Sequence, residues 1–208
     1  VIARIIQDSA LGLDHAHHAM ARDGKSLSVI HRDVSPQNIM VRTDGVTKVV
    51  DFGIAKASHI ESRTATGILK GKIRYMSPEQ IYGQSIDHRS DQYALGVVLW
   101  ELCARERLFK AASDVMALAH MMERPITPPS TMSPDLPPML EHVVLRMLAR
   151  DRDRRYARCS DVAQALGEYL ASLARPVRTV EVAAFIESVV GARVKERTAN
   201  LEPSKENF

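Results

Sequence analysis

Apolar residues recur at the spacing of an α-helix over most of the chain. The pattern predicts helices over residues 1–21, 90–104, 113–122, 139–148, 161–173 and 180–190. The stretch 90–104 is apolar almost all round, and a helix without a polar face belongs in the interior of a protein. We therefore predict a predominantly helical fold in which 90–104 is the buried axis.

Short runs of β-type residues interrupt this helical pattern. They cover residues 28–31, 39–42 and 47–50, and the last two flank Asp44-Gly45, which is a strong turn signal. We expect these two runs to form a hairpin, so the predicted fold class is α+β. Residues 54–80 show little periodicity, which predicts a long loop of the functional or mobile kind.

The composition is typical of an ordinary folded chain. Hydrophobic residues make up 45% and charged residues 25% of the 208 residues, enough for one domain with a core. The formal net charge of +3 is small, so we expect no nucleic-acid partner. No run of ~18 apolar residues occurs, which predicts no membrane segment in this chain. Cys103 and Cys159 form no CxxC pair, so we expect a reducing cytoplasm rather than a disulfide framework or a zinc site.

Five signals that carry chemistry or fold information follow one another along the chain. They are His31-Arg-Asp-Val-Ser-Pro-Gln-Asn38 after a predicted strand, Asp51-Phe-Gly53 after the hairpin, Ser77-Pro-Glu79, the pair Asp91 and Gly96, and Arg155. A single match would be weak, but the order and context of all five make coincidence negligible. Together they resemble the Hanks-type (eukaryotic-like) bacterial Ser/Thr protein kinases. The resemblance covers about residues 1–173, which is the C-terminal, larger lobe of that family.

The resemblance implies a role for each residue of the site. Asp33 corresponds to the catalytic base that accepts the proton of the substrate hydroxyl. Asn38 and Asp51 correspond to the ligands of the Mg²⁺ ion that bridges the phosphates of ATP. Met40 corresponds to the residue that packs under the adenine ring. Either aspartate alone would more often be a turn former, and the joint context favours the functional interpretation.

Other residues of the resemblance have structural roles. Glu79 and Arg155 correspond to an ion pair that fixes the activation segment, and Asp91 corresponds to the anchor of the catalytic-loop backbone. A separate feature of the first helix is a group of three histidines. We interpret them as surface or packing residues rather than metal ligands, because adjacent residues on a helix point to different faces. They are His15, His17 and His18.

Arg32 places a cation directly before the expected base. In the family such an arginine often meets a phosphorylated activation loop. The candidate acceptors here are Ser62, Thr64 and Thr66. For any single one of them, an ordinary polar loop residue is the alternative interpretation.

Two positions near the expected base depart from the family pattern. Ser/Thr kinases usually carry a lysine two residues after the catalytic aspartate, where this chain has Ser35, and a threonine at the position of Lys72. We interpret these departures as a reciprocal exchange, in which Lys72 supplies the cation for the γ-phosphate and Ser35 supplies the hydroxyl near the base. The alternative is that Lys72 points into solvent and the enzyme is slower.

The glycine-rich loop of the family, its phosphate-binding lysine and the glutamate that orients this lysine would all precede Val1. We therefore expect the N-terminal lobe to be absent from this chain and the chain alone to be close to inactive. Residues 1–173 are assigned to the kinase C-terminal lobe, with a catalytic loop at 31–38 and an activation segment at 51–79. Residues 174–208 are assigned to a C-terminal extension with one short helix and a disordered tail.

The predicted function is the transfer of the γ-phosphate of MgATP to Ser or Thr hydroxyls of a protein substrate. The main alternative is a truncated pseudokinase or docking module without catalysis. Retention of Asp33, Asn38 and Asp51 argues against it, because a scaffold needs neither metal ligands nor a base. A small-molecule kinase of related fold is disfavoured by Ser77-Pro-Glu79 and by Asp91.

Overall fold

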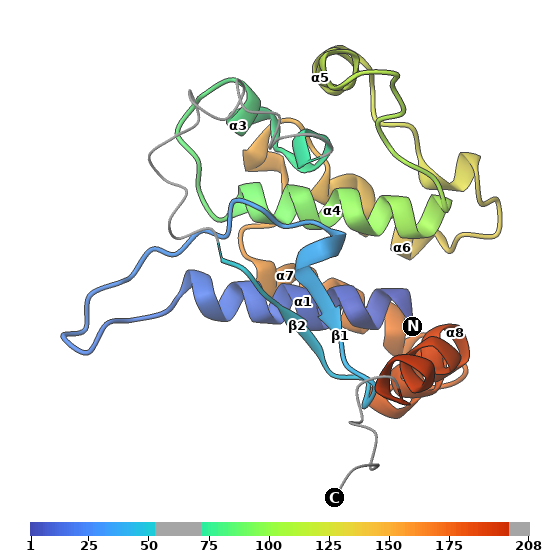
Figure 1. Cartoon of the computed structure of the whole chain (residues 1–208). Coiled ribbons are helices and arrows are strands. Elements are labelled where there is room, and N and C mark those ends of the chain that lie inside the picture. Colours follow the sequence, from blue (N-terminus) through green and yellow to red (C-terminus); the bar gives the residue numbers. More distant parts are fainter. Residues whose placement is uncertain (53–71, 200–208) are drawn as a thin grey trace, which may run out of the picture.

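Helix α4, Arg89–Ala104, runs through the middle of the fold (Figure 1). The computed structural model describes residues 1–52 and 72–199. Thirteen of the sixteen residues of α4 are buried, which confirms the predicted buried axis. Helix α4 packs against α1 (Ile2–His17) and α6 (Pro138–Met147), and α1 in turn lies along α7 (Cys159–Ala171).

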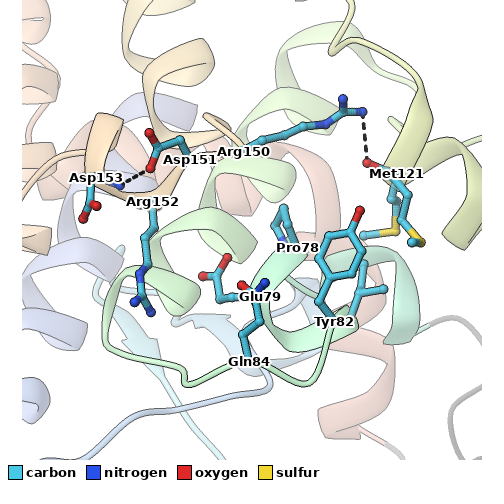
Figure 2. Close-up of a pocket in the computed structure, with 11 residues that line it drawn as sticks. Pro78, Glu79, Tyr82, Gln84, Met121, Arg150, Asp151, Arg152 and Asp153 are labelled. Atoms are coloured by element: carbon cyan, nitrogen blue, oxygen red, sulfur yellow. Dashed lines mark hydrogen bonds between the residues drawn. The ribbon is translucent and has the colours of Figure 1, made fainter.

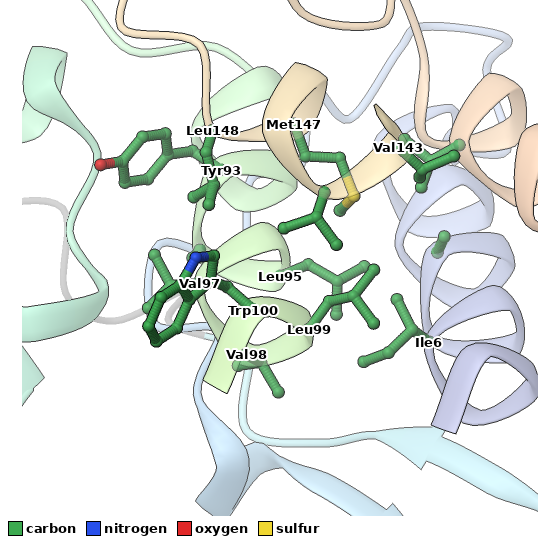
Figure 3. Close-up of a cluster of buried hydrophobic side chains, with 14 of the residues drawn as sticks. Ile6, Tyr93, Leu95, Val97, Val98, Leu99, Trp100, Val143, Met147 and Leu148 are labelled. Carbon is green, nitrogen blue, oxygen red and sulfur yellow. The ribbon is translucent and has the colours of Figure 1, made fainter. Parts of the chain in front are cut away.

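The hydrophobic core lies where α4 meets α1 and α6. Figure 3 shows Leu95 and Leu99 of α4 beside Met147 of α6 and near Ile6 of α1. Gly96 allows this close approach, because a Cβ atom at that position would lie 2.9 Å from the Cβ of Met147. A glycine inside a helix costs roughly 0.5–1 kcal/mol relative to alanine, so close helix packing is the physical reason for its place here.

The small sheet is the predicted hairpin. Strands β1 (Ile39–Val41) and β2 (Thr47–Val49) are antiparallel, and Met40 pairs with Lys48. The hairpin is anchored on α1, where a Cβ atom at Gly12 would lie 4.0 Å from Cγ2 of Val49. Gly45 in the turn has a φ of 85°, a conformation that glycine adopts without strain. The predicted hairpin is therefore confirmed.

The remaining elements surround this centre. They are the 3₁₀ turns η1 (Pro36–Asn38), η3 (Lys72–Tyr75), η4 (Pro129–Thr131) and η5 (Arg152–Arg154), and the helices α3 (Pro78–Ile81), α5 (Asp114–Glu123) and α8 (Thr179–Ala199). Helix α5 stands at the edge of the fold, on the side of α3, and α8 lies on the opposite side (Figure 1). Within residues 1–52 and 72–199, no helix is both long enough and apolar enough to cross a membrane.

One predicted strand is wrong. Residues 28–31 form no strand in the described part of the chain, and Ser28 has a φ of 44°. The physical reason is that the backbone at the end of this segment has a side chain as its partner. The N–H groups of His31 and Arg32 donate to the side chain of Asp91 and not to a neighbouring strand.

Several element ends also differ from the prediction. Helix α1 ends at His17 instead of running to residue 21, and the ring of His18 bonds to the carbonyl oxygen of Asp14 at 2.8 Å. Helix α8 is longer than predicted, because it continues through 192–199, where the polar composition had predicted a frayed tail. Inside the predicted loop 54–80, residues 72–75 and 78–81 form helical turns. The domain boundary at 173 stays a prediction.

Candidate active site

A buried carboxylate of α4 holds the predicted catalytic loop. Asp91 is 1% exposed, and it accepts the N–H groups of His31 at 2.7 Å and Arg32 at 2.8 Å. Arg32 has a φ of 65°, and with this backbone the two consecutive N–H groups reach the same side chain. Because the carboxylate is buried and charge-assisted hydrogen bonds are strong, the start of the loop is firmly attached to the core. The prediction that Asp91 anchors this loop is confirmed.

Helix α1 contributes to the same anchor through a histidine. His17 is buried, and its Nε2 lies 2.8 Å from Oδ2 of Asp91. Its neighbour His18 is exposed and bonds to the backbone of its own helix. The two adjacent histidines thus point to different faces, as predicted, and His17 has a packing role.

The loop folds back on itself and brings two predicted site residues together. Nδ2 of Asn38 donates to the carbonyl oxygen of Asp33 at 2.7 Å, and the N–H of Asn38 donates to the carbonyl oxygen of Ser35 at 3.0 Å. The N–H of Asp33 lies 3.3 Å from Nδ1 of His31. Asn38 is therefore fixed beside Asp33 by the backbone of the loop itself.

The backbone directly before Asp51 is bonded to the same loop. The residue before it, Val50, donates its N–H to the carbonyl oxygen of Asn38 at 2.9 Å and accepts a hydrogen bond from Nε2 of His31 at 2.9 Å. The ring of Phe52 packs on His31 with 4.5 Å between the centroids. Asp51 is exposed and has a φ of 59°, a strained backbone that is frequent at functional sites.

The two predicted metal ligands have the chemistry that Mg²⁺ prefers. The NH₂ group of Asn38 is used by its bond to Asp33, so the amide oxygen is the atom that remains for a cation. Asp51 adds an exposed carboxylate from the neighbouring segment. Magnesium takes hard oxygen ligands, usually one or two from protein together with phosphate and water oxygens. The donor set of Asn38 and Asp51 therefore fits Mg²⁺.

Met40 lies on an open face of the hairpin. Its side chain is 52% exposed, whereas its strand neighbours Ile39 and Val41 are half-buried. An exposed apolar side chain two residues after Asn38 suits a flat apolar ligand group. Its predicted contact with adenine stays a prediction.

Ser35 and Lys72 are only partly described. Ser35 is 1% exposed, and its hydroxyl has no hydrogen-bond partner among the described residues. Lys72 begins η3, but its side chain lies outside the described part of the chain. Gly53, Gly71 and the candidate phosphate acceptors Ser62, Thr64 and Thr66 lie outside it as well. The predicted exchange between positions 35 and 72 therefore stays a prediction.

The predicted ion pair between Glu79 and Arg155 is confirmed. Two hydrogen bonds of 2.7 and 2.9 Å join the side chains, which are 4% and 0% exposed, and Ser90 adds a third bond of 2.7 Å to Glu79. Burial by itself would raise the pKa of Glu79, but the hydrogen bonds from Arg155 and Ser90 outweigh it and lower the pKa to about 2. The pair joins α3 to the turn after α6, so it fixes the end of the predicted activation segment.

Glu79→Ala should destabilise the fold by about 3 kcal/mol, because it leaves the buried guanidinium of Arg155 without its counter-charge. Glu106→Ala is the control, since Glu106 forms an exposed ion pair with Lys110 and such pairs contribute about 0–1 kcal/mol. Chemical denaturation of both variants measures the difference. Equal losses in the two variants would contradict a special role for the buried pair.

The low pKa of Glu79 also predicts how stability depends on pH. A carboxyl group whose pKa is lower in the folded state stabilises the fold above its unfolded pKa. That contribution should be complete above about pH 5 and should decline as the pH falls toward the folded value of about 2. Denaturation midpoints measured across this range for the wild type and Glu79→Gln should converge at the acidic end.

A pocket of about 370 Å³ lies beside this ion pair, between α3, α5 and the turn at 150–153 (Figure 2). Its walls include Tyr82 and Met121, and Arg150 crosses it to reach the carbonyl oxygen of Met121 at 3.2 Å. Arg152 bonds to the carbonyl oxygen of Ser85 at 2.7 Å. Both arginines thus hold the backbone of neighbouring segments, and none of the predicted phosphate-transfer residues lines this pocket.

Sequence reasoning missed Gln80, which links α3 to the loop. Its side chain accepts the N–H of Ser77 at 2.9 Å, and its Nε2 donates to the carbonyl oxygen of Arg32 at 3.4 Å. The signal was present, because Ser77 followed three residues later by Gln80 is the pattern of a capping box. This one side chain joins the predicted catalytic loop to the predicted activation segment.

Comparison with known proteins agrees with this geometry. Residues 1–167 match the family described as protein kinase domain. The chain is 37% identical over 199 residues to the tyrosine-protein kinase MasK of Myxococcus xanthus, which covers 95% of this chain and 31% of the relative. It is 40% identical over 161 residues to the serine/threonine-protein kinase PknB of Mycolicibacterium smegmatis, which covers 76% of this chain and 24% of the relative.

PknB of Mycobacterium tuberculosis gives a similar result, with 39% identity over 161 residues. The chain thus spans about a quarter to a third of the length of these curated relatives. The family match covers well over half of the chain and includes every residue of the site described above. The chain therefore belongs to the protein kinase domain family, among its Hanks-type bacterial members.

Proposed function

We propose that this lobe transfers the γ-phosphate of ATP to a hydroxyl group of a protein substrate. One observation carries the proposal more than any other. The buried carboxylate of Asp91 holds the loop from which Asp33 and Asn38 project, and the same loop is bonded to the residue before Asp51. The three groups that phosphate transfer needs thus lie on two segments that are tied to each other and to the core.

The proposed division of work follows from the chemistry of each side chain. Asp33 accepts the proton of the attacking hydroxyl, and Asn38 and Asp51 hold a Mg²⁺ ion through their oxygens. The bound ion supplies neutralisation of the charge on the phosphates. Met40 provides an apolar surface for the adenine ring. The bond from Asn38 to the backbone of Asp33 keeps the base and the metal ligand in a fixed relation, so little reorganisation is needed during transfer.

We propose Ser and Thr as the acceptor residues. The segment Tyr75-Met-Ser-Pro-Glu79 resembles the Ser/Thr class, and the PknB relatives carry that activity in their names. The specific rival is tyrosine, because the Myxococcus relative that covers 95% of this chain is named a tyrosine-protein kinase. Phosphoamino-acid analysis of a mixed protein substrate, after incubation with labelled ATP, separates the two. Label on phosphotyrosine alone would overturn the Ser/Thr assignment.

A pseudokinase or docking module is the alternative function. It predicts that nucleotide and Mg²⁺ bind weakly or not at all and that no label is transferred. The oxygen donor set of Asn38 and Asp51 favours the enzyme, because a docking surface has no need of two cation ligands. In a protein with a kinase small lobe in front of Val1, binding of MgADP, measured with and without the metal, separates the two functions even before transfer is tested.

We further propose that residues 1–208 alone bind ATP weakly. Their sequence contains neither the glycine-rich loop of the family nor the family's phosphate-binding lysine that would precede Val1, and phosphate transfer depends on positioning and charge stabilisation. Calorimetric titration of the 208-residue chain with MgATP should show a dissociation constant above about 1 mM, equivalent to less than about 4 kcal/mol of binding free energy. Joining a kinase small lobe in front of Val1 should tighten it. Robust turnover by the 208-residue chain would contradict this proposal.

A further inference from the structure

The turn of the β1–β2 hairpin lies under the start of α8. Residues 42–44 and 46 are exposed, whereas Gly45 between them is buried. A Cβ atom at Gly45 would lie 2.8 Å from the backbone nitrogen of Ala183 and even closer to the carbonyl oxygen of Thr179. Both atoms belong to the first turn of α8. The contact is therefore made by backbone against backbone, and only glycine leaves room for it.

Helix α8 has an anchor that is separate from the main core. Val182 is fully buried, but it does not belong to the main cluster of buried apolar residues around α4. The match to the kinase family ends at residue 167, before α8 begins. The similarity to the Myxococcus relative covers 95% of the chain and so extends over α8. The helix is thus an addition to the lobe that at least one relative shares.

The hairpin turn that α8 covers is internally fixed. The N–H of Arg42 donates to the carbonyl oxygen of Val46 and the N–H of Gly45 to that of Arg42, both at 2.9 Å. The side chain of Asp44 accepts the N–H of Val46 at 3.1 Å and pairs with Arg42 at 2.6 Å. A turn held by four such contacts moves as one body with the strands that leave it.

The other end of the hairpin carries the site. Val49 of β2 rests on α1 at Gly12, which is a fixed point between the turn and Asp51. Movement of the turn therefore changes the position of residues on both sides of this fixed point. Met40, which is opposite Lys48, lies on the side of the turn and moves with it, whereas Asp51 lies on the other side, after Val50 and its bond to Asn38.

We propose that α8 is a positioning element for the nucleotide site, acting through its contact with Gly45. The proposal rests on the proposed function, because it takes Met40 and Asp51 to be the nucleotide and metal contacts. While the first turn of α8 rests on the hairpin turn, these two residues are held for binding. Release of α8 lets the hairpin shift and weakens nucleotide binding. Any interaction that displaces α8 from the hairpin turn therefore lowers the affinity for ATP.

The contact itself is tested by Gly45→Asn, with Gly24→Asn as the matched control. Both glycines have positive φ angles, 85° and 81°, and asparagine tolerates this conformation better than most residues. Nothing lies within 4 Å of a Cβ atom at Gly24, whereas one at Gly45 meets α8. Hydrogen exchange of the 208-residue chain should show faster exchange of residues 179–193 in Gly45→Asn only. Unchanged protection of α8 in Gly45→Asn would overturn the contact.

The coupling is tested by nucleotide affinity in a protein with a kinase small lobe in front of Val1. In Gly45→Asn the dissociation constant for MgADP should rise on the order of tenfold, less than the hundredfold that a misplacement of 1 Å costs in catalysis. Val182→Asp places a charge at the buried anchor of α8 and leaves the sequence of the hairpin unchanged, so it should release α8 and have the same effect. The double variant should be no worse than either single variant, because both act through one contact. Gly24→Asn should stay within about twofold of the wild type.

These results distinguish the coupling from the proposed function. If α8 is released in both variants and MgADP affinity does not change, the coupling is overturned. If affinity changes as expected and the wild type transfers no phosphate, the proposed function fails and the coupling stands. The rate at saturating ATP should fall less than the affinity, because Asp33 and its anchor Asp91 are not part of the hairpin. A loss confined to the rate would contradict positioning of the nucleotide.

Discussion

Asp33→Ala and Asp51→Ala should each lower phosphate transfer on the order of a thousandfold in a protein that carries both kinase lobes. The first substitution removes the proposed base. The second removes the proposed Mg²⁺ ligand, and the positive charge of the ion would then no longer stabilise the transferring phosphate. Asp51 is exposed and Asp33 is half-buried, so neither side chain is part of the apolar core. The rate of transfer from labelled ATP to a protein substrate measures the loss.

The two variants should differ in nucleotide binding. Asp51→Ala should weaken the binding of MgADP, whereas Asp33→Ala should leave it nearly unchanged, because the base contacts the acceptor and not the metal. Asp135→Ala, an exposed aspartate between η4 and α6, is the control for a general loss of charge. Thermal unfolding should give similar midpoints for all three variants. Near wild-type transfer by either site variant would show that its assignment is wrong.

The second large effect concerns Ser35 and Lys72. If the two positions exchange the usual lysine and hydroxyl, Lys72→Thr should slow transfer on the order of a hundredfold, similar to the loss of one charge-stabilising donor. The double variant Lys72→Thr with Ser35→Lys should recover much of the rate, because it restores the usual arrangement. The hydroxyl of Ser35 is buried and has no hydrogen-bond partner within the described residues, which is consistent with a position that faces another polar group.

A double-mutant cycle on the two-lobed protein measures this exchange. Lys72→Arg should keep most of the activity, since it keeps the charge, and Lys110→Thr is the control for loss of an exposed lysine. Ser35→Lys alone should be harmful, because it brings two cations to a buried position. Independent effects that multiply in the double variant would contradict the exchange and favour a solvent-facing Lys72.

The predictions from sequence were best where a local pattern agreed with burial. The apolar residues of 90–104 correctly predicted the buried axis of the fold, and Asp44-Gly45 correctly predicted the hairpin. Both signals act over a few neighbouring residues. The strand predicted at 28–31 failed for the opposite reason. The N–H of His31, at the end of this segment, donates to Asp91, which is sixty positions away in the sequence. A pattern of hydrophobic residues carries no information about such a bond.

The site shows the same division. Spacing and order singled out Asp33, Asn38 and Asp51 as candidates, whose roles stay predictions, but gave no information about what holds these residues in place. The contribution of His17 to the anchor and the bond from Gln80 to the loop depend on the meeting of distant segments. The contact of α8 with Gly45 could not be predicted from the sequence either. The tight turn alone accounts for a glycine at position 45, so the residue gives no sign of a second contact.

The anchor at Asp91 limits which residues position 91 tolerates. One carboxylate accepts two backbone N–H groups and faces a histidine, so the position needs two acceptor oxygens at a fixed reach. Asparagine has the right length but would direct its own N–H₂ toward one of these donors, and glutamate would push the loop outward by a methylene group. Although Asp91 is not proposed to touch any substrate, we expect aspartate to be the only residue that this position tolerates.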